Sequence, residues 1–460
     1  ETPGGKGSER KASASEELRA AMATLAAPGA LNLEQYGGDI NEQYDAVVGW
    51  LAHHGDWLLI LDNADSKEAV NAVMELADSL HGGHVLIISR RSFLDAANIA
   101  DLPLETLTDE EGAKFLLERT GSGEDCRNEA RAVTKLLGGL FLALEQAAAW
   151  IKESGHSFEK YLNYADKMES RIALLGKKVQ GGTQYGRSVA TTWLITVQSL
   201  GELSQNILRI MSWFGSAPMP DDFLLVKKDA EWTPSGEEPT EMVIDEALSE
   251  LARYSMISRD ENFFSVHRLH QAAIYADLEE EKRPVWAKWA VEQFNACAPN
   301  PEDVKLWPVW DFLRPHAEQL NNMMEKMNIG PAQGLFLNQF GLYLFKRAQY
   351  KKAEPLMRRT MEINENTYGE KHPRVASALN NLAQLLQDTN RLKEAEPLMR
   401  RALEIDESSY GPEHPNVAIR LNNLALLLKS TNRLKEAEPL MWRVVTIFEK
   451  SYGEMHPNVA

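Results

Sequence analysis

The side chains best placed to do chemistry follow two short apolar runs in the first hundred residues. The run DWLLILDNAD (56–65) ends in the carboxylates Asp62 and Asp65, and the run HVLIISRRS (84–92) ends with Arg90 near its close. Short apolar runs bounded by polar residues are typical of buried parallel strands. Ligands of α/β sheets bind where such strands end, so the pattern predicts a ligand site at this sheet edge.

The segment between the two runs completes a crossover unit. SKEAVNAVMELADSL (66–80) has the apolar spacing of a helix, so we expect a strand, a helix and a parallel strand in succession. Many strands are apolar runs that end in aspartate, so this run alone does not identify the ligand. The identity of the ligand has to be inferred from other motifs of the chain.

The sequence lacks the motif that most often holds nucleotide phosphates. No GxxxxGK[ST] occurs in the 460 residues, and GGKGSER (4–10) has a different spacing and no strand before it. The backbone cradle and lysine of that loop supply most of the affinity for phosphate. We therefore expect this chain not to hydrolyse ATP, and we interpret it as a fragment cut at both ends or as an incomplete gene model.

Two other kinds of site find little support. The histidines beside the strands have no accompanying cysteine or carboxylate pattern, which argues against a metal site; they are His53, His54, His81 and His84. SVHRLHQ (265–271) puts His267 and His270 on one helical face, where core packing and a ligand contact are both open. No Gly-x-Ser-x-Gly element accompanies them, so a serine hydrolase is disfavoured.

Charge and composition narrow the class of protein. The net charge is −18, yet residues 331–460 hold 18 Lys and Arg against 15 Asp and Glu, so the acidity lies in the first 330 residues. An acidic body disfavours nucleic acid as the main partner. Only Cys126 and Cys297 occur, which suits a reducing compartment. No signal peptide or membrane-spanning run is visible, so we expect a cytoplasmic protein without membrane contact.

A 42-residue repeat dominates the C-terminal end. Residues 353–394 and 395–436 align without a gap and are identical at 29 of 42 positions. AEPLM recurs at 353, 395 and 437, and HP at 372, 414 and 456. A fixed period of this size predicts an all-α solenoid whose units bury their apolar faces against their neighbours and bind partners.

Each repeat reads as two helices, here about 375–388 and 392–408, with a turn at Asn390 and an end before Gly411. Besides its apolar stripe, the first helix carries a polar stripe, and its asparagine recurs in every unit. A solvated surface and a peptide-binding surface are both open for the glutamines, whereas we favour peptide binding for the asparagines. The candidates are Asn338, Ser377, Asn380, Gln384, Gln387 and Asn422.

Two family resemblances follow from these segments. LNNLA and EAEPLMRRALEI make residues 331–460 resemble tetratricopeptide repeats of the kinesin light chain type, which implies a peptide or protein partner in a groove lined by the first helices. The order DWLLILDNAD, GGLFLAL (138–144) and SVHRLHQ resembles the NB-ARC type of signal-transduction ATPase of the STAND class. That resemblance implies an ADP/ATP switch that self-assembles on activation.

The second resemblance also assigns roles to single residues. Asp62 matches the Walker B aspartate that holds Mg²⁺ through water, and Arg90 matches the arginine near the γ-phosphate. His267 matches the winged-helix histidine that reaches the β-phosphate of ADP. Phe141 stands where the family has the proline that touches adenine. Asp65 is a substitute candidate for the general base, because Asn63 replaces the usual second acid.

These arguments predict five segments. They are a truncated P-loop-type α/β core (1–105), a helical domain (106–180), a winged-helix domain (181–280), a helical linker (281–330) and a tetratricopeptide solenoid (331–460). Our leading hypothesis is an ADP/ATP-dependent signalling switch with a repeat sensor. The alternative is an interaction scaffold that needs no nucleotide.

Overall fold

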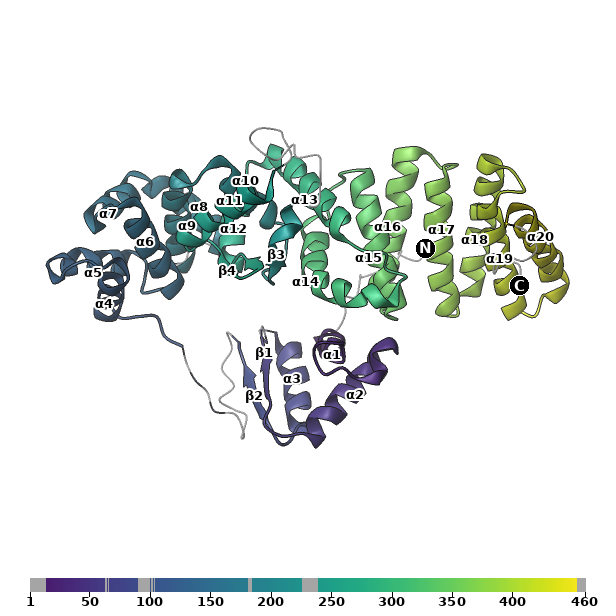
Figure 1. Ribbon diagram of the computed structural model, residues 1–460, viewed down its shortest axis with the longest axis horizontal. Coiled ribbons are helices and arrows are strands. Elements are labelled where there is room, and N and C mark those ends of the chain that lie inside the picture. Colours follow the sequence, from purple (N-terminus) through teal and green to yellow (C-terminus); the bar gives the residue numbers. More distant parts are fainter. Residues whose placement is uncertain are drawn as a thin grey trace, which may run out of the picture. The chain divides into compact units, whose positions relative to one another are not determined.

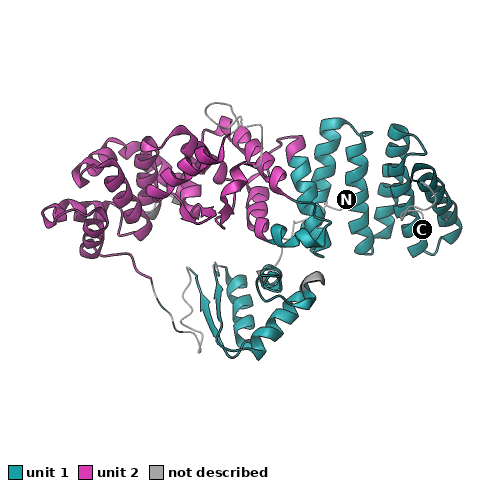
Figure 2. Cartoon of the chain, viewed as in Figure 1, with its two compact units in different colours: residues 1–102, 299–311, 333–460 teal, residues 103–298, 312–332 magenta. Residues whose placement is uncertain are grey.

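The protein is represented by a computed structural model, which describes residues 14–62, 64, 66–89, 100, 102, 104–180, 184–225 and 239–452. The chain divides into two compact units (Figure 2): unit 1 holds residues 1–102, 299–311 and 333–460, and unit 2 holds residues 103–298 and 312–332. Within the described ranges, no helix is long and apolar enough to cross a membrane.

The N-terminal part of unit 1 contains the predicted crossover. Strands β1 (Leu58–Leu61) and β2 (His84–Ile87) pair in parallel, and α3 (Lys67–Ser79) joins them. Helix α3 begins at Ser66, whose hydroxyl accepts a hydrogen bond from the amide of Ala69 at 3.0 Å. The remaining elements here are α1 (Ala14–Thr24), η1 (Glu34–Gly37) and α2 (Ile40–His53).

One face of this small sheet is covered and the other is open. Leu61 belongs to a buried cluster with Val73 and Leu76 of α3, whereas Leu58 and Ile60 are 61% and 54% exposed. The described residues place only two strands in this sheet. The strand–helix–strand prediction is confirmed, but two strands do not establish a P-loop-type α/β core.

The C-terminal part of unit 1 is a row of helix pairs, which stand side by side in chain order (Figure 1). The helices are α15 (Pro331–Lys346), α16 (Tyr350–Tyr368), α17 (Pro373–Asp388), α18 (Leu392–Tyr410), α19 (Pro415–Ser430) and α20 (Leu434–Tyr452). The two helices predicted for the central repeat are confirmed within two residues. Asn390 in the turn between them has a φ of 60°, and Gly411, which follows α18, has a φ of 86°.

The recurring Tyr-Gly and His-Pro landmarks lie where a second helix ends and the next first helix begins, at α17 and α19. The ring of His372 accepts a hydrogen bond from the amide of Arg374, and Pro373 occupies the first helical position. Tyr368 stacks on His372 with ring centroids 4.6 Å apart, and Tyr410 and His414 repeat this geometry. The repeat therefore encodes its own helix boundaries.

The predicted apolar stripes form the core of the repeats. Leu379, Leu382 and Leu386 of α17 are at most 1% exposed, as are Met399 and Ala402 of α18. Helix α14 (Trp307–Met323) precedes the array, and Trp310 stacks on Tyr343 of α15 with centroids 5.0 Å apart. Just before α14 lies η6 (Val304–Leu306).

Unit 2 begins with a group of helices and continues with helices around a small sheet. The first group is α4 (Asp109–Thr120), η2 (Glu124–Cys126), α5 (Arg127–Leu136), α6 (Phe141–Ser154), α7 (Phe158–Lys167) and α8 (Glu169–Gln180). A capping box between Thr108 and Glu111 starts α4. The assignment of residues 106–180 to a separate helical domain stays a prediction.

The second part of unit 2 holds a three-stranded antiparallel sheet of order β3-β5-β4, with β3 (Met219–Pro220), β4 (Ser258–Asp260) and β5 (Phe263–Ser265). Buried aromatic side chains of this part include Trp213, Phe214, Phe223 and, in β5 itself, Phe264. The helical elements are α9 (Gln184–Thr196), η3 (Val197–Ser199), α10 (Glu202–Met211), η4 (Asp221–Leu225), α11 (Glu241–Arg253), α12 (Arg268–Asp277), η5 (Glu280–Lys282) and α13 (Arg283–Cys297).

Candidate nucleotide residues and the repeat surface

The strand ends of unit 1 form one edge, as the sequence predicted. The amide of Ala64 donates to the carbonyl of Ile88 at 3.2 Å, and the Ser89 hydroxyl donates to the carbonyl of Ala64 at 2.6 Å. These bonds fix the chain that follows β1 against the chain that follows β2. Asp62 is exposed at this edge. The other two candidates of the edge, Asp65 and Arg90, lie outside the described residues.

Phe141 is the first residue of α6 and is 57% exposed. Its ring packs against Phe115 of α4, with centroids 4.9 Å apart. Leu140 precedes it without a side-chain cap, so amide groups at this helix start keep their donor capacity. Gly139 allows the backbone before α6 to lie close to Leu107. Its amide and its carbonyl form hydrogen bonds with neighbouring backbone groups, and a Cβ at this position would lie 2.0 Å from the Leu107 oxygen.

His267 caps the start of α12. Its Nδ1 accepts a hydrogen bond from the amide of Leu269 at 3.3 Å. The pKa of His267 is lowered, first by the protein atoms around the ring and second by the charge of Arg268. A neutral ring whose Nδ1 accepts must carry its proton on Nε2. The exposed His267 is therefore equipped to donate one hydrogen bond to an anion.

His270 has a different environment from its neighbour. It is 1% exposed, and burial lowers its pKa to about 4. Its Nδ1 lies 3.2 Å from the carbonyl of Met256 and 3.4 Å from Nε2 of Gln146 in α6. Core packing and a ligand contact were both open for the two histidines, and His270 is a core residue.

The contact between Gln146 and His270 joins α6 to α12. Beside it, Glu145 of α6 accepts hydrogen bonds from Arg119, at 2.7 Å, and from Ser255, at 3.1 Å. Phe141 and His267 thus begin two helices that meet within unit 2. Asp62 belongs to unit 1. Among the described residues, no group of three or more metal-ligating side chains gathers.

The asparagines of the repeats form a ladder between successive first helices. Nδ2 of Asn381 donates to Oδ1 of Asn338 at 3.0 Å, and Nδ2 of Asn423 donates to Oδ1 of Asn380 at 2.8 Å. Each bond joins residues 43 positions apart. The ladder leaves Asn380 only 4% exposed, and the contact of a ligand with this residue stays a prediction.

The other candidates of the polar stripe are more accessible. Ser377 is exposed and accepts a hydrogen bond from Arg420 at 3.0 Å, while Gln384, Gln387 and Asn422 are half-buried. The sequence reasoning did not single out Asn381 and Asn423. The repeated Asn-Asn pair could have indicated them. Only the first asparagine of each pair has the helical spacing of the predicted polar stripe, so the second asparagine needs a different role.

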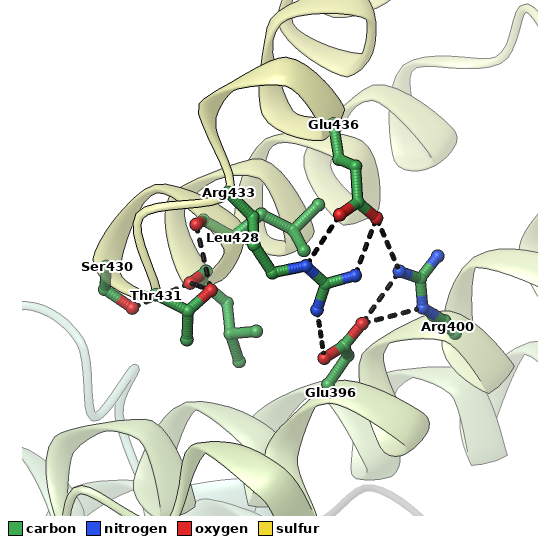
Figure 3. A network of polar contacts seen from close by, with 8 residues as sticks. Glu396, Arg400, Leu428, Ser430, Thr431, Arg433 and Glu436 are labelled. Atoms are coloured by element: carbon green, nitrogen blue, oxygen red, sulfur yellow. Dashed lines mark hydrogen bonds and ion pairs between the residues drawn. The ribbon is translucent and has the colours of Figure 1, made fainter.

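A second ladder, made of charges, follows the second helices. Arg433 donates to Glu396 at 2.7 Å and to Glu436 at 2.6 Å, and Arg400 also pairs with Glu396 (Figure 3). The same four-residue network occurs 42 residues earlier in Glu354, Arg358, Arg391 and Glu394. The repeat therefore fixes both its core and the polar links to its neighbour.

Two family profiles match parts of the chain. The tetratricopeptide repeat profile matches residues 334–408 and 387–450. A profile described as a domain of unknown function (DUF7779) matches residues 195–283, which run from the end of α9 to the start of α13. The predicted tetratricopeptide repeats are confirmed.

Comparison with whole proteins gives similar results. The chain is 25% identical over 374 residues to a nucleotide-binding leucine-rich repeat (NLR)-like protein of Hyaloscypha variabilis, and the match covers 71% of the chain and 35% of that protein. The chain thus spans about a third of the length of this relative.

Two solved structures are similar to the chain at low TM-scores. One is a putative kinesin light chain with tetratricopeptide-like repeats from Podosopora anserina, with 18% identity, 40% and 82% of the two chains covered and a TM-score of 0.32. The other is a STAND protein with a tetratricopeptide repeat sensor from Pyrococcus horikoshii, with 14% identity, 94% and 75% covered and a TM-score of 0.37. The repeat profile and the NLR-like relative confirm the resemblance read from the sequence: the chain is similar to signal-transduction ATPases of the NB-ARC/STAND type and carries C-terminal tetratricopeptide repeats.

Proposed function

We propose that this chain is the switch and sensor part of an NB-ARC/STAND-type signalling protein whose tetratricopeptide repeats bind a protein or peptide partner. The observation that carries the proposal is the union, in one chain, of a confirmed repeat array with a body similar to an NLR-like protein. A partner that binds one conformation more tightly than the other shifts the switch without any need for rapid turnover.

The nucleotide part of the proposal rests on three residues. Asp62 supplies a carboxylate for a water-bound Mg²⁺, His267 supplies an Nε2–H donor for a phosphate oxygen, and Phe141 supplies an exposed ring at a helix start. Each of these groups is of a kind that binds ADP or ATP, but the 460 residues contain no phosphate-cradling loop. Hydrolysis is therefore not assigned to this chain.

The two unpaired cysteines, Cys126 and Cys297, are compatible with a reducing compartment, and we propose the cytoplasm. Self-assembly on activation belongs to the same proposal.

The predicted division into core, helical domain, winged helix, linker and repeats is the structural framework of the proposal. In it the three-stranded sheet of unit 2 with α10, α11 and α12 serves as the winged helix.

The test is the nucleotide content of the natural protein. The protein is purified without added nucleotide and denatured, and the released nucleotide is identified by chromatography. We expect ADP near one mole per mole of protein, and less ADP after His267→Ala. Protein free of nucleotide that still captures its partner would instead support the nucleotide-independent scaffold, which the absent loop and Phe141 favour.

A further inference from the structure

Each first helix of the array carries one partly exposed stripe, in which Asn380 alone is buried, and the three stripes stay in register. We call these twelve positions the first-helix surface. They are Leu335, Asn338, Gln339 and Leu342 of α15, Ser377, Asn380, Asn381 and Gln384 of α17, and Ile419, Asn422, Asn423 and Leu426 of α19. The asparagine ladder and the Arg420–Ser377 bond hold the helices side by side, so the stripes form one continuous surface.

The chemistry of this surface changes from helix to helix. Leu335, Ile419 and Leu426 are 46%, 47% and 45% exposed. At the matching positions, the middle helix carries Ser377 and Gln384. Two apolar patches, one on α15 and one on α19, therefore flank a polar strip on α17.

This pattern stands out against the near-identity of the repeats. The aligned units agree at 29 of 42 positions, and the buried leucines are among the identical ones. Position 377 becomes isoleucine at 419, and position 384 becomes leucine at 426. Exposing aliphatic side chains has no benefit for the fold, since they gain stability only when covered. The change from polar to apolar therefore points to a ligand.

Charge and spacing define that ligand. None of the twelve side chains is ionisable, and the charge of Arg420, which donates to Ser377, is paired with Asp406. Neighbouring helices pack with axes about 8–10 Å apart, so the two apolar patches lie roughly 16–20 Å apart. An extended chain covers this span in about five to six residues, and only an even separation turns both side chains to the same face.

We infer that the first-helix surface binds an extended, uncharged polypeptide segment that carries two apolar side chains about six residues apart. The apolar side chains cover the patches on α15 and α19, and the peptide groups between them bond to Ser377 and Gln384. This inference rests on the peptide-binding function proposed above and adds the chemistry of the partner.

The probes are short fluorescein-labelled peptides of serine, threonine, glutamine and glycine with two leucines, and binding to the 460-residue chain is read by fluorescence polarisation. We expect the peptide with leucines about six residues apart to bind about tenfold more tightly than peptides with one leucine or a shorter spacing. A glutamate or lysine pair between the leucines should not improve binding.

Variants connect this preference to the surface. Leu335→Ser and Ile419→Ser should each remove the advantage of the second leucine. Leu434→Ser is the matched control, because Leu434 is 55% exposed on the second helix α20 and should have no effect. Unchanged thermal unfolding of all three variants shows that the fold is kept.

Two results would overturn the inference, and they are distinguishable. Peptides that bind without regard to leucine spacing, or that bind best when charged, overturn the ligand chemistry but keep the peptide-binding function. If neither these peptides nor any peptide selected from a random displayed library binds, the peptide-binding function fails and the inference fails with it.

Discussion

The carboxylate of Asp406 and the guanidinium of Arg420 form an ion pair, with Oδ2 and Nε 2.8 Å apart, in which the Asp406 side chain is 1% exposed. Asp406 lies on α18 and Arg420 on α19, so the pair joins two successive repeats. Asp406→Ala leaves Arg420, 12% exposed, without its carboxylate. We expect a loss of about 3 kcal/mol in the free energy of unfolding, measured by chemical denaturation.

Matched variants separate this effect from a general loss of helix stability. Glu404→Ala removes an exposed carboxylate from the same helix and should change stability little. Asp406→Asn introduces the residue found 42 positions earlier, where Nδ2 of Asn364 bonds to the carbonyl of Arg374, and should cost less than alanine. Equal unfolding midpoints for Asp406→Ala and Glu404→Ala would show that the ion pair contributes nothing.

The charge ladder predicts a sensitivity to acid. Hydrogen bonds from Arg400, followed by those from Arg433, lower the pKa of Glu396 against the opposing effect of burial. A carboxyl group with a lowered folded-state pKa stabilises the fold above its unfolded pKa, near 4.3, and this contribution disappears as pH falls through the folded value. Glu396→Gln should therefore reduce the fall of the melting temperature below about pH 5, with a change of about 2 °C or less at pH 7.

Glu438→Gln is the internal control for that measurement. Position 438 is the equivalent of 396 in the last helix, but it is exposed, and Trp442 stands where Arg400 would be. The control should leave the acid limb of the melting curve unchanged. Identical behaviour of the two glutamine variants would contradict the assignment of acid sensitivity to the ladder.

The repeats show which features sequence reasoning could reach. The helix bounds were predictable because the caps are local: His-Pro starts a helix, and a glycine with positive φ ends it. The ladders were not predictable in detail. The asparagine bonds join residues 43 apart and the Arg391–Glu354 bond joins residues 37 apart, so they depend on how one repeat stacks on the next.

The candidate nucleotide residues show the same division. The sequence placed Asp62 at the end of a strand, because an apolar run and a polar stop are local signals. It placed His267 and His270 on one helical face but could not separate them. The packing of Gln146 from α6 makes that distinction, since it buries His270 and leaves His267 at the helix start.

Two buried histidines predict a second pH dependence, in unit 2. Burial lowers the pKa of His270 and of His316 to about 4. A histidine in the unfolded chain titrates near 6.5, so these residues stabilise the fold above that value, and the contribution is lost as pH falls from about 6.5 to about 4. His270→Gln should flatten this part of the stability curve by an amount on the order of 3 kcal/mol.

Chemical denaturation at successive pH values measures the effect. Glutamine retains a polar group for Met256 and Gln146, so the variant is expected to fold at neutral pH. His156→Gln is the control, because His156 is exposed in the same unit and should not alter the curve. A His270→Gln curve parallel to that of the unchanged protein between pH 6.5 and 4 would reject the burial argument.

Two glycines of unit 2 provide the most direct test of the joint between α4 and α6. Gly139 and Gly155 have nearly equal φ values, 65° and 64°, but a Cβ on Gly139 would lie 2.0 Å from the Leu107 oxygen, whereas a Cβ on Gly155 meets nothing within 4 Å. Gly155→Ala should cost only about 1 kcal/mol for the left-handed backbone. Gly139→Ala must also displace a backbone carbonyl, so we expect about 3 kcal/mol or more from denaturation curves. If both variants unfold at the same denaturant concentration, the Gly-Gly turn before Phe141 does not need its close approach to Leu107.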